Sequence, residues 1–213
     1  MSDGGVAGAG YLAIKVNDVE LPAASNLVKH VTMIEGTYTF PHMLFEFNDM
    51  HHLFEGAYSI VDGTKITIAI GSSADTAKAY DFRISGHRHY SQAGMPVIEA
   101  AGILDKSKFM FEAAAYSKRG NSTDVLADIA KKCGLEFKTD LVSDDSMVWQ
   151  SLNTRPRSFI EYIERRMWIG EGKLPQTCVT LGSKLLLIDQ VAELEKKPKL
   201  TICYNYPAQK GDI

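Results

Sequence analysis

The sequence predicts an α+β protein, with an antiparallel β-barrel, a small helical insertion domain and a short C-terminal β segment. Three observations lead to this prediction. Residues 11–116 contain short runs of alternating apolar and polar side chains with turn residues between them, and no helical period. The period then becomes that of two amphipathic helices within residues 117–175. Strand-like alternation begins again in residues 176–213.

Turn residues separate the strand candidates of the first region. Asn17-Asp18 and Asp62-Gly63 are typical of turns, and Phe109 and Phe111 are expected to share one face of the last strand. The candidate strands are 11–16, 19–22, 31–40, 43–47, 65–70, 80–84, 97–104 and 108–116. Such spacing predicts an antiparallel barrel or sandwich, whose edges are removed by closure or by pairing with a neighbouring subunit. Residues 1–10 are small and Gly-rich and predict a flexible arm.

The first predicted helix covers residues 122–133. Ser122 is a suitable N-cap, and Val125, Ile129 and Cys133 form an apolar stripe with a spacing of four residues. Gly134 occupies the position at which a glycine commonly ends a helix. Three turns of helix are too short to be stable alone in water, so this stripe must pack against another part of the protein.

The second predicted helix covers residues 158–168. Ser158 and Glu161 have the spacing of a capping box, and Gly170 follows the last apolar residue. Its apolar stripe consists of Phe159, Ile160, Ile163 and Met167. Between the helices, residues 135–138 and 147–152 have extended character. After them, strands are predicted at 177–182, 184–189 and 199–206, with a charged, exposed stretch at 192–198.

Composition excludes several classes of protein. The 213 residues carry a formal net charge of -3, which gives no electrostatic footprint for binding nucleic acid. Cys133, Cys178 and Cys203 form no CxxC pair, so they predict buried free thiols and no structural zinc site. No signal peptide and no apolar run of membrane-spanning length is visible, so we expect a soluble protein made in the cytoplasm.

Residues that could carry chemistry do not converge on a recognisable site. His87 and His89 share a strand face and follow His51-His52, but no carboxylate cluster completes a metal site around them. The carboxylates that could act as acid and base have the spacing of helix caps and solvated faces: Asp124, Asp128, Asp144, Asp145, Glu161 and Glu164. We therefore expect no enzyme activity, no cofactor and no bound metal.

One group of residues is a candidate for binding a partner protein. Basic side chains flank the second helix, and two tryptophans, Trp149 and Trp168, are near them in the sequence. Arginine and aromatic residues are enriched in protein interfaces. The alternative is an ordinary solvated helix end. The candidate partner-binding residues are Arg155, Arg157, Arg165, Arg166 and Trp168.

Three segments in order resemble a known family. They are Ser122-Thr-Asp-Val-Leu-Ala-Asp-Ile-Ala-Lys-Lys-Cys-Gly134, the helix start Ser158-Phe-Ile-Glu-Tyr-Ile, and a strand pair that ends at Leu-Leu-Ile-Asp189. Together with the β-rich lead, they resemble the bacteriophage tail baseplate hub proteins. This family includes the T-even hub, the late-control D proteins and the base of the type VI secretion spike. The resemblance covers residues 11–190.

The resemblance implies a structural virion protein without catalysis. Residues 11–116 would form a barrel similar to a tail-tube subunit, and the copies would form a ring, a homotrimer in this family. That ring would join the tail tube to the central spike and surround the channel for DNA, which is only passing cargo. The implied partners are the chain itself, the tail tube or tube-initiator protein, the spike and the tape-measure protein. The implied location is the virion tail or baseplate, after assembly in the host cytoplasm.

One departure from the family and one alternative function remain open. Residues 176–213 are too few to build a full second barrel, so other strands or another chain would have to complete it, or the ring would have a different number of copies. The alternative is a β-sandwich with a helical insertion that binds a small ligand or carbohydrate. Its pocket would be lined by Trp149, Trp168 or the aromatic residues of 80–84.

Overall fold

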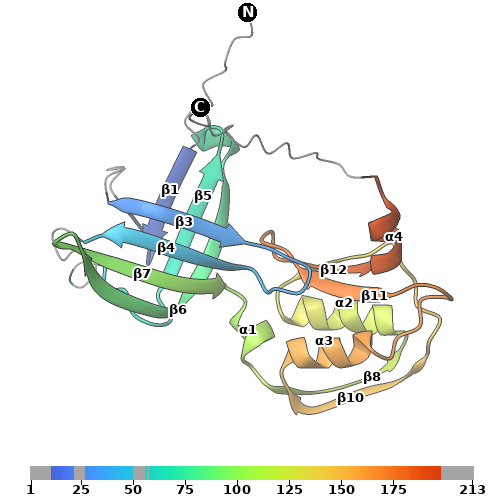
Figure 1. The fold of residues 1–213 in the computed structure, drawn as a ribbon. Helices are drawn as coiled ribbons and strands as arrows, with labels where there is room; N and C mark the ends of the chain where they lie inside the picture. The colour runs from blue at the N-terminus through green and yellow to red at the C-terminus, as the bar shows by residue number, and fades with distance from the viewer. Residues whose placement is uncertain (1–10, 22–26, 50–55, 57, 198–213) are drawn as a thin grey trace, which may run out of the picture.

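The protein consists of a curled β-sheet and a second lobe in which helices lie between strands (Figure 1). The computed structural model describes residues 11–21, 27–49, 56 and 58–197. The predicted arm at 1–10 and the predicted strand at 199–206 lie outside the described residues. None of the helices in the described ranges is long and apolar enough to cross a membrane.

The first lobe is a seven-stranded antiparallel sheet with the order β2-β1-β5-β6-β7-β4-β3. A short 3-10 helix, Ala74–Thr76, connects β5 to β6. The strands are β1 (Tyr11–Val16), β2 (Val19–Glu20), β3 (Val28–Ile34), β4 (His42–Asn48), β5 (Lys65–Gly71), β6 (Lys78–Gln92) and β7 (Met95–Leu104).

The sheet curls but does not close, so the prediction of a closed barrel is wrong. Within the described part of the chain, β2 and β3 are the two edges and do not pair with each other. The physical reason is the length of β2, which has only two residues, Val19 and Glu20, and so offers little backbone for closure. The inner face is nevertheless apolar, because alternate residues of each strand, among them Phe45, Ile68 and Phe82, are completely buried.

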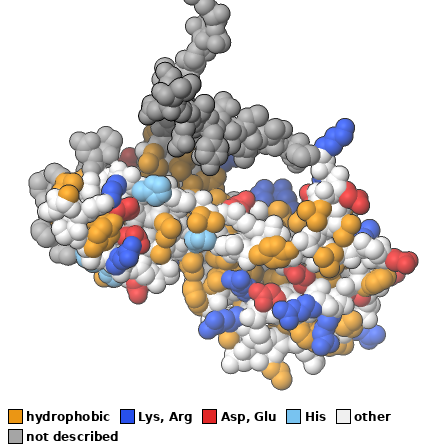
Figure 2. Space-filling model, in the orientation of Figure 1, with side chains coloured by type: hydrophobic (Ala, Val, Ile, Leu, Met, Phe, Trp, Pro, Cys, Tyr) orange, Lys and Arg blue, Asp and Glu red, His pale blue; other side chains and the backbone are white. Residues whose placement is uncertain are grey.

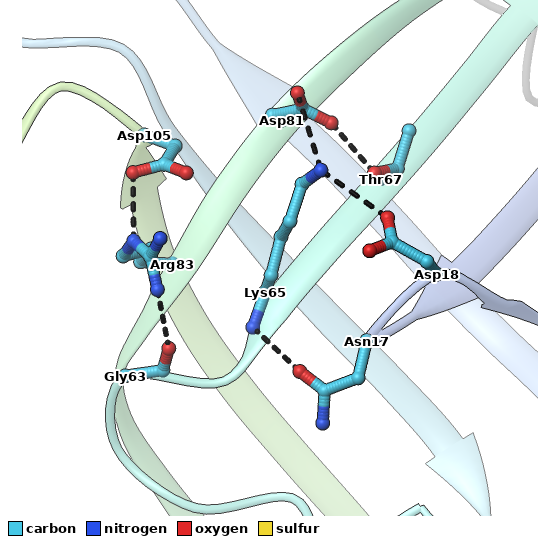
Figure 3. A network of polar contacts seen from close by, with 8 residues as sticks. All are labelled: Asn17, Asp18, Gly63, Lys65, Thr67, Asp81, Arg83 and Asp105. Carbon is cyan, nitrogen blue, oxygen red and sulfur yellow. Dashed lines mark hydrogen bonds and ion pairs between the residues drawn. The ribbon is translucent and has the colours of Figure 1, made fainter.

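The outer face of the sheet carries a solvated network of charged side chains. The ammonium of Lys65 lies 3.3 Å from a carboxylate oxygen of Asp18 and 3.7 Å from one of Asp81, while Arg83 donates to Asp105 at 2.7 Å (Figure 3). The hydrogen bond to Asp18, followed by the charge of Asp81, raises the pKa of Lys65. Exposed ion pairs of this kind contribute little stability, so this network marks the solvent side of the sheet.

The second lobe has three layers. Helices α2 (Ser122–Lys132) and α3 (Pro156–Glu164) lie between a two-stranded ribbon and a three-stranded sheet (Figure 1). The ribbon pairs β8 (Ala114–Gly120) with β10 (Met147–Thr154). The sheet has the order β11-β12-β9, with β11 (Pro175–Val179), β12 (Lys184–Asp189) and β9 (Glu136–Lys138). Two short helices, α1 (Ser107–Met110) and α4 (Gln190–Glu195), complete the lobe.

One hydrophobic core joins the layers of the second lobe. Phe109, Ile129, Ile163 and Leu187 belong to the same cluster of buried residues. The helical stripes therefore pack within the chain, between two sets of strands. This core takes residues from all three segments that the sequence predicts, which are 11–116, 117–175 and 176–213. The division of the chain into domains stays a prediction.

The predicted strand at 108–116 is wrong in its first half. Residues Ser107–Met110 form α1, and β8 begins only at Ala114. Phe109 is buried against the ring of Phe40, with ring centres 5.6 Å apart and nearly parallel, whereas Phe111 is exposed. The contact between these two rings from different lobes favours the helical turn over the alternation that the sequence shows.

Both predicted helices form. The first begins at Ser122, the first residue of the predicted range, but its N-cap is not the predicted one, and the second begins two residues earlier than predicted. Asn121 is the N-cap of α2, and Ser122 is buried inside the first turn. In α3, Pro156 is the first helical residue, so the capping box that starts at Ser158 does not exist. Proline suits that position because its φ angle is already helical. It has no backbone N–H, and an N–H at the first helical position would have no acceptor within the helix.

The predicted end of the first helix is confirmed. Gly134 has a φ of 69°, and the N–H of Leu135 donates to the carbonyl of Ala130 at 2.9 Å. This is the arrangement in which a glycine in the left-handed region satisfies the last free carbonyls of a helix. The second helix ends earlier than predicted, at Glu164.

The turn between β3 and β4 ties the two lobes together. Glu35 accepts a hydrogen bond from the backbone N–H of Leu181, and the hydroxyl of Tyr38 accepts one from the side chain of Gln190. Together with the contact between Phe40 and Phe109, these bonds connect residues far apart in the sequence and hold the curled sheet against the second lobe.

Candidate partner-binding surface

Helix α3 determines where the predicted arginines lie. Its apolar side chains, Phe159, Ile160 and Ile163, are buried in the core, so the opposite side of the helix faces solvent. Arg155 is the N-cap and Arg165 the C-cap, and both are exposed. On the face seen in Figure 2, Lys and Arg side chains over the second lobe are interspersed with hydrophobic ones.

Arg165 and Arg166 form the centre of the candidate surface. Together with Ser158, Glu161 and Tyr162 they line a shallow groove on the outer side of α3. The guanidinium of Arg166 lies 4.3 Å from the centre of the Tyr162 ring, which is a cation–π contact. Among the described residues, neither arginine forms an ion pair. Their charges are therefore available to an acidic partner.

Arg157 does not line this groove, although it forms an ion pair with Glu161, which does. Its Nε lies 3.2 Å from Glu161 and its Nη1 lies 3.9 Å from the sulfur of Met110. It lines a crevice of about 200 Å³ between α3, β11 and the turn at Tyr38. The structure thus places Arg165 and Arg166 in one groove and directs Arg157 towards the junction of the lobes.

The two tryptophans of the sequence prediction have different environments. Trp168 is 54% exposed, so its ring is available to a partner. Trp149 is buried, and its indole N–H donates to the carbonyl of Gly120 at 3.1 Å. Trp149 therefore belongs to the core of the lobe and is not exposed to a partner, although its ring is in T-shaped contact with the Tyr162 ring that Arg166 covers, with ring centres 6.5 Å apart.

Asp145 is important for the shape of this surface, and sequence reasoning assigned it no such role. One carboxylate oxygen accepts from the N–H of Ser122 at 2.8 Å and the other from the N–H of Trp168 at 3.0 Å. The N–H of Asp144 in turn donates to the carbonyl of Trp168 at 3.0 Å. These bonds fix the backbone of Trp168 while its ring stays exposed. The sequence around Asp145 reads only as a polar loop, so it does not indicate that the carboxylate accepts these two bonds.

The other polar residues of the sequence prediction that the structure describes lie in ion pairs and ring contacts. The rings of His87 and His89 are in edge contact, and His87 lies 3.3 Å from Asp62. In the ranges that the structure describes, no group of three or more His, Cys, Asp or Glu residues could hold a metal ion. His51-His52 and Cys203 lie outside those ranges.

The carboxylates and thiols of the second lobe have structural surroundings. Glu164 accepts from the backbone N–H of Thr177 at 2.7 Å. The side chain of Lys132, and then the hydroxyl of Tyr116, lower the pKa of Asp128. Burial raises the pKa of the Cys133 thiol to about 11, so this cysteine is protonated and unreactive at neutral pH.

Comparison with known proteins gives matches in structure and none in sequence. No protein-family model matches the chain, and no curated protein matches it. The 43 kDa tail protein of prophage MuSo2 from Shewanella oneidensis matches 84% of this chain with a TM-score of 0.58 and 10% identity. A tail protein from Neisseria meningitidis MC58 matches 94% of it with a TM-score of 0.57 and 11% identity. The fold is similar to that of phage tail proteins.

The similarity extends across both lobes but not across the whole of the matched proteins. The chain spans 54% of the Shewanella oneidensis protein and 56% of the Neisseria meningitidis protein, about half the length of each. The predicted similarity to phage tail proteins is therefore confirmed for the fold.

Proposed function

We propose that this chain is a structural, non-catalytic component of a phage tail, at the baseplate hub that joins the tail tube to the central spike. The observation that supports this most strongly is the similarity of fold to two tail proteins over 84% and 94% of the chain. The assignment to the hub rests on three segments that resemble the hub family: residues 122–134, the helix start 158–163, and the strand pair that ends at 186–189.

The edges of the curled sheet support assembly with other chains. Strand β3 has seven residues and, among the described residues, pairs only with β4, so its outer backbone groups are free. An open strand edge of this kind can pair with a strand of another chain. In our proposal, copies join through these edges into a ring, a trimer or a ring of another copy number, whose sheets surround the passing DNA.

The groove on α3 provides a second contact. Arg165 and Arg166 line this groove and, among the described residues, form no ion pair, while the ring of Trp168, two residues beyond Arg166, is exposed. Arginine and tryptophan are common energetic centres of interfaces. In our proposal this surface binds a neighbouring tail protein, for which the tube or tube-initiator protein, the spike and the tape-measure protein are the candidates.

Imaging of assembled particles tests the proposal. Electron cryo-microscopy of virion tails that contain the chain is expected to show a ring between tube and spike. In our proposal this ring is assembled in the host cytoplasm. Mass measurement of the purified chain at rising concentration checks self-association independently. A chain that stays monomeric at high concentration, together with tails that contain no ring of it, would contradict the proposal.

A further inference from the structure

The second lobe contains a small apolar pocket that the tail function does not use. Its volume is about 150 Å³, and it opens between the ribbon, α2 and the start of α3. Aromatic and aliphatic side chains form most of its wall, including Tyr116, Ile129, Pro156 and Phe159, and the thiol-bearing Cys133 belongs to the same wall. Lys108 and Glu112 are among the charged residues that line it.

One wall residue has a hydroxyl without a partner. Ser151 is only 5% exposed, and within the described chain its Oγ has no hydrogen bond. Across the ribbon it pairs with Tyr116, whose own hydroxyl already donates to Asp128 at 2.9 Å. A buried hydroxyl without a partner has lost its hydrogen bonds to water and gained none, so such groups are rare in native proteins and point to a missing partner.

The size and the lining of the pocket together define the missing partner. A dry protein cavity of about 150 Å³ is large enough to admit a single benzene ring. We propose that this pocket binds a ring-sized apolar group that carries one hydroxyl or carbonyl, and that Ser151 Oγ is its hydrogen-bonding anchor. Because Ser151 Oγ holds no bond in the described chain, its rotation towards the ligand breaks none.

Two sources can supply this chemistry, a free phenol-like molecule or the side chain of a tyrosine on a partner chain. Both place an aromatic ring against Phe159 and Tyr116 and a hydroxyl within reach of Ser151. The ammonium of Lys132 lies 4.5 Å from the centre of the Tyr116 ring and 3.0 Å from Asp128, which holds that ring at the pocket wall.

Titration of the full chain with phenol and with benzene, followed by NMR of the pocket residues, tests the proposal. We expect saturable binding of phenol and a loss of about 2- to 12-fold in its affinity in Ser151→Ala, which corresponds to one hydrogen bond. Benzene should bind no more weakly to this variant than to the wild type. Ser122→Ala is the matched control, because Ser122 Oγ is also buried and unpartnered but does not line the pocket.

Two further arms complete the experiment. Ala114→Leu adds bulk at an exposed position of the lining and should abolish binding of both rings without unfolding the chain. Binding of N-acetyltyrosinamide in addition to phenol supports a partner side chain as the source, and binding of phenol alone supports a free molecule. Equal phenol affinity of the wild type and Ser151→Ala, no saturable binding, or a crystal soaked with phenol that shows only water at Ser151 would overturn the proposal.

Discussion

A carboxylate oxygen of Asp145 accepts a hydrogen bond from the backbone N–H of Ser122 at 2.8 Å, across 23 residues of sequence. Its second oxygen binds the N–H of Trp168 just after α3. One side chain therefore links the start of α2 to the segment that follows α3. The N–H of Ser122 lies in the first turn of α2, where backbone donors have no acceptor within the helix, so the Asp145 carboxylate satisfies it as an N-cap side chain would.

Asp145→Ala should lower the free energy of unfolding by about 2 kcal/mol, because it leaves two backbone donors without their charged acceptor. Urea denaturation measures the change. Asp144→Ala is the matched control, since only the backbone of Asp144 takes part in the described bonds. Equal stability of the two variants would show that water replaces the carboxylate at no cost.

Arg165→Glu should leave the fold intact. Under the proposed function, it should lower the affinity for the neighbouring tail protein by on the order of tenfold, because it reverses a charge in the α3 groove. Circular dichroism checks the fold, and incorporation of the chain into tail particles measures assembly. Lys78→Glu, an exposed charge reversal on the first lobe, is the control. Normal incorporation of Arg165→Glu would place the partner surface elsewhere.

The sequence was sufficient for elements whose residues repeat a period. The alternation of Ile66, Ile68 and Ile70 predicted a buried face of β5, which is correct for Ile66 and Ile68, whereas Ile70 near the end of the strand is 40% exposed. The stripe of Phe159, Ile160 and Ile163 correctly predicted the buried face of α3. Gly134 correctly marked the end of α2. In each of these cases local geometry and burial favour the same residue types, so the pattern alone is informative.

Features that depend on distant contacts could not be predicted. The stacking of Phe109 on Phe40 favours the helix α1 where the sequence pattern predicts a strand. The sheet does not close, because β2 is short. The candidate site was found in part. Arg166 lies four residues after Tyr162, a spacing that could have suggested their contact, whereas nothing in the local sequence indicated that Asp145 positions Trp168.

Ile163→Asp should prevent stable folding of the second lobe. Ile163 is completely buried between the two sets of strands, and a carboxylate there would be removed from water into a cluster of apolar side chains. The expected loss is on the order of 5 kcal/mol, comparable to the whole stability of a typical domain. Thermal unfolding followed by circular dichroism measures it. Ser158→Asp, on the exposed side of the same helix, should unfold like the wild type, and a cooperative native-like transition of Ile163→Asp would contradict the described core.

Acid should destabilise the chain partly through Asp128. The hydrogen bond from Lys132, followed by that from Tyr116, lowers the pKa of Asp128 below its ordinary value of 3.8. The folded state therefore binds this proton more weakly than the unfolded state, so the stabilisation is present above the unfolded pKa and is lost as the pH falls through the folded one. Urea denaturation between about pH 6 and about pH 3 should show a shallower loss of stability for Asp128→Asn than for the wild type or the loop variant Asp140→Asn. Identical pH profiles for all three proteins would mean that the contacts with Lys132 and Tyr116 do not act on the folded state in solution.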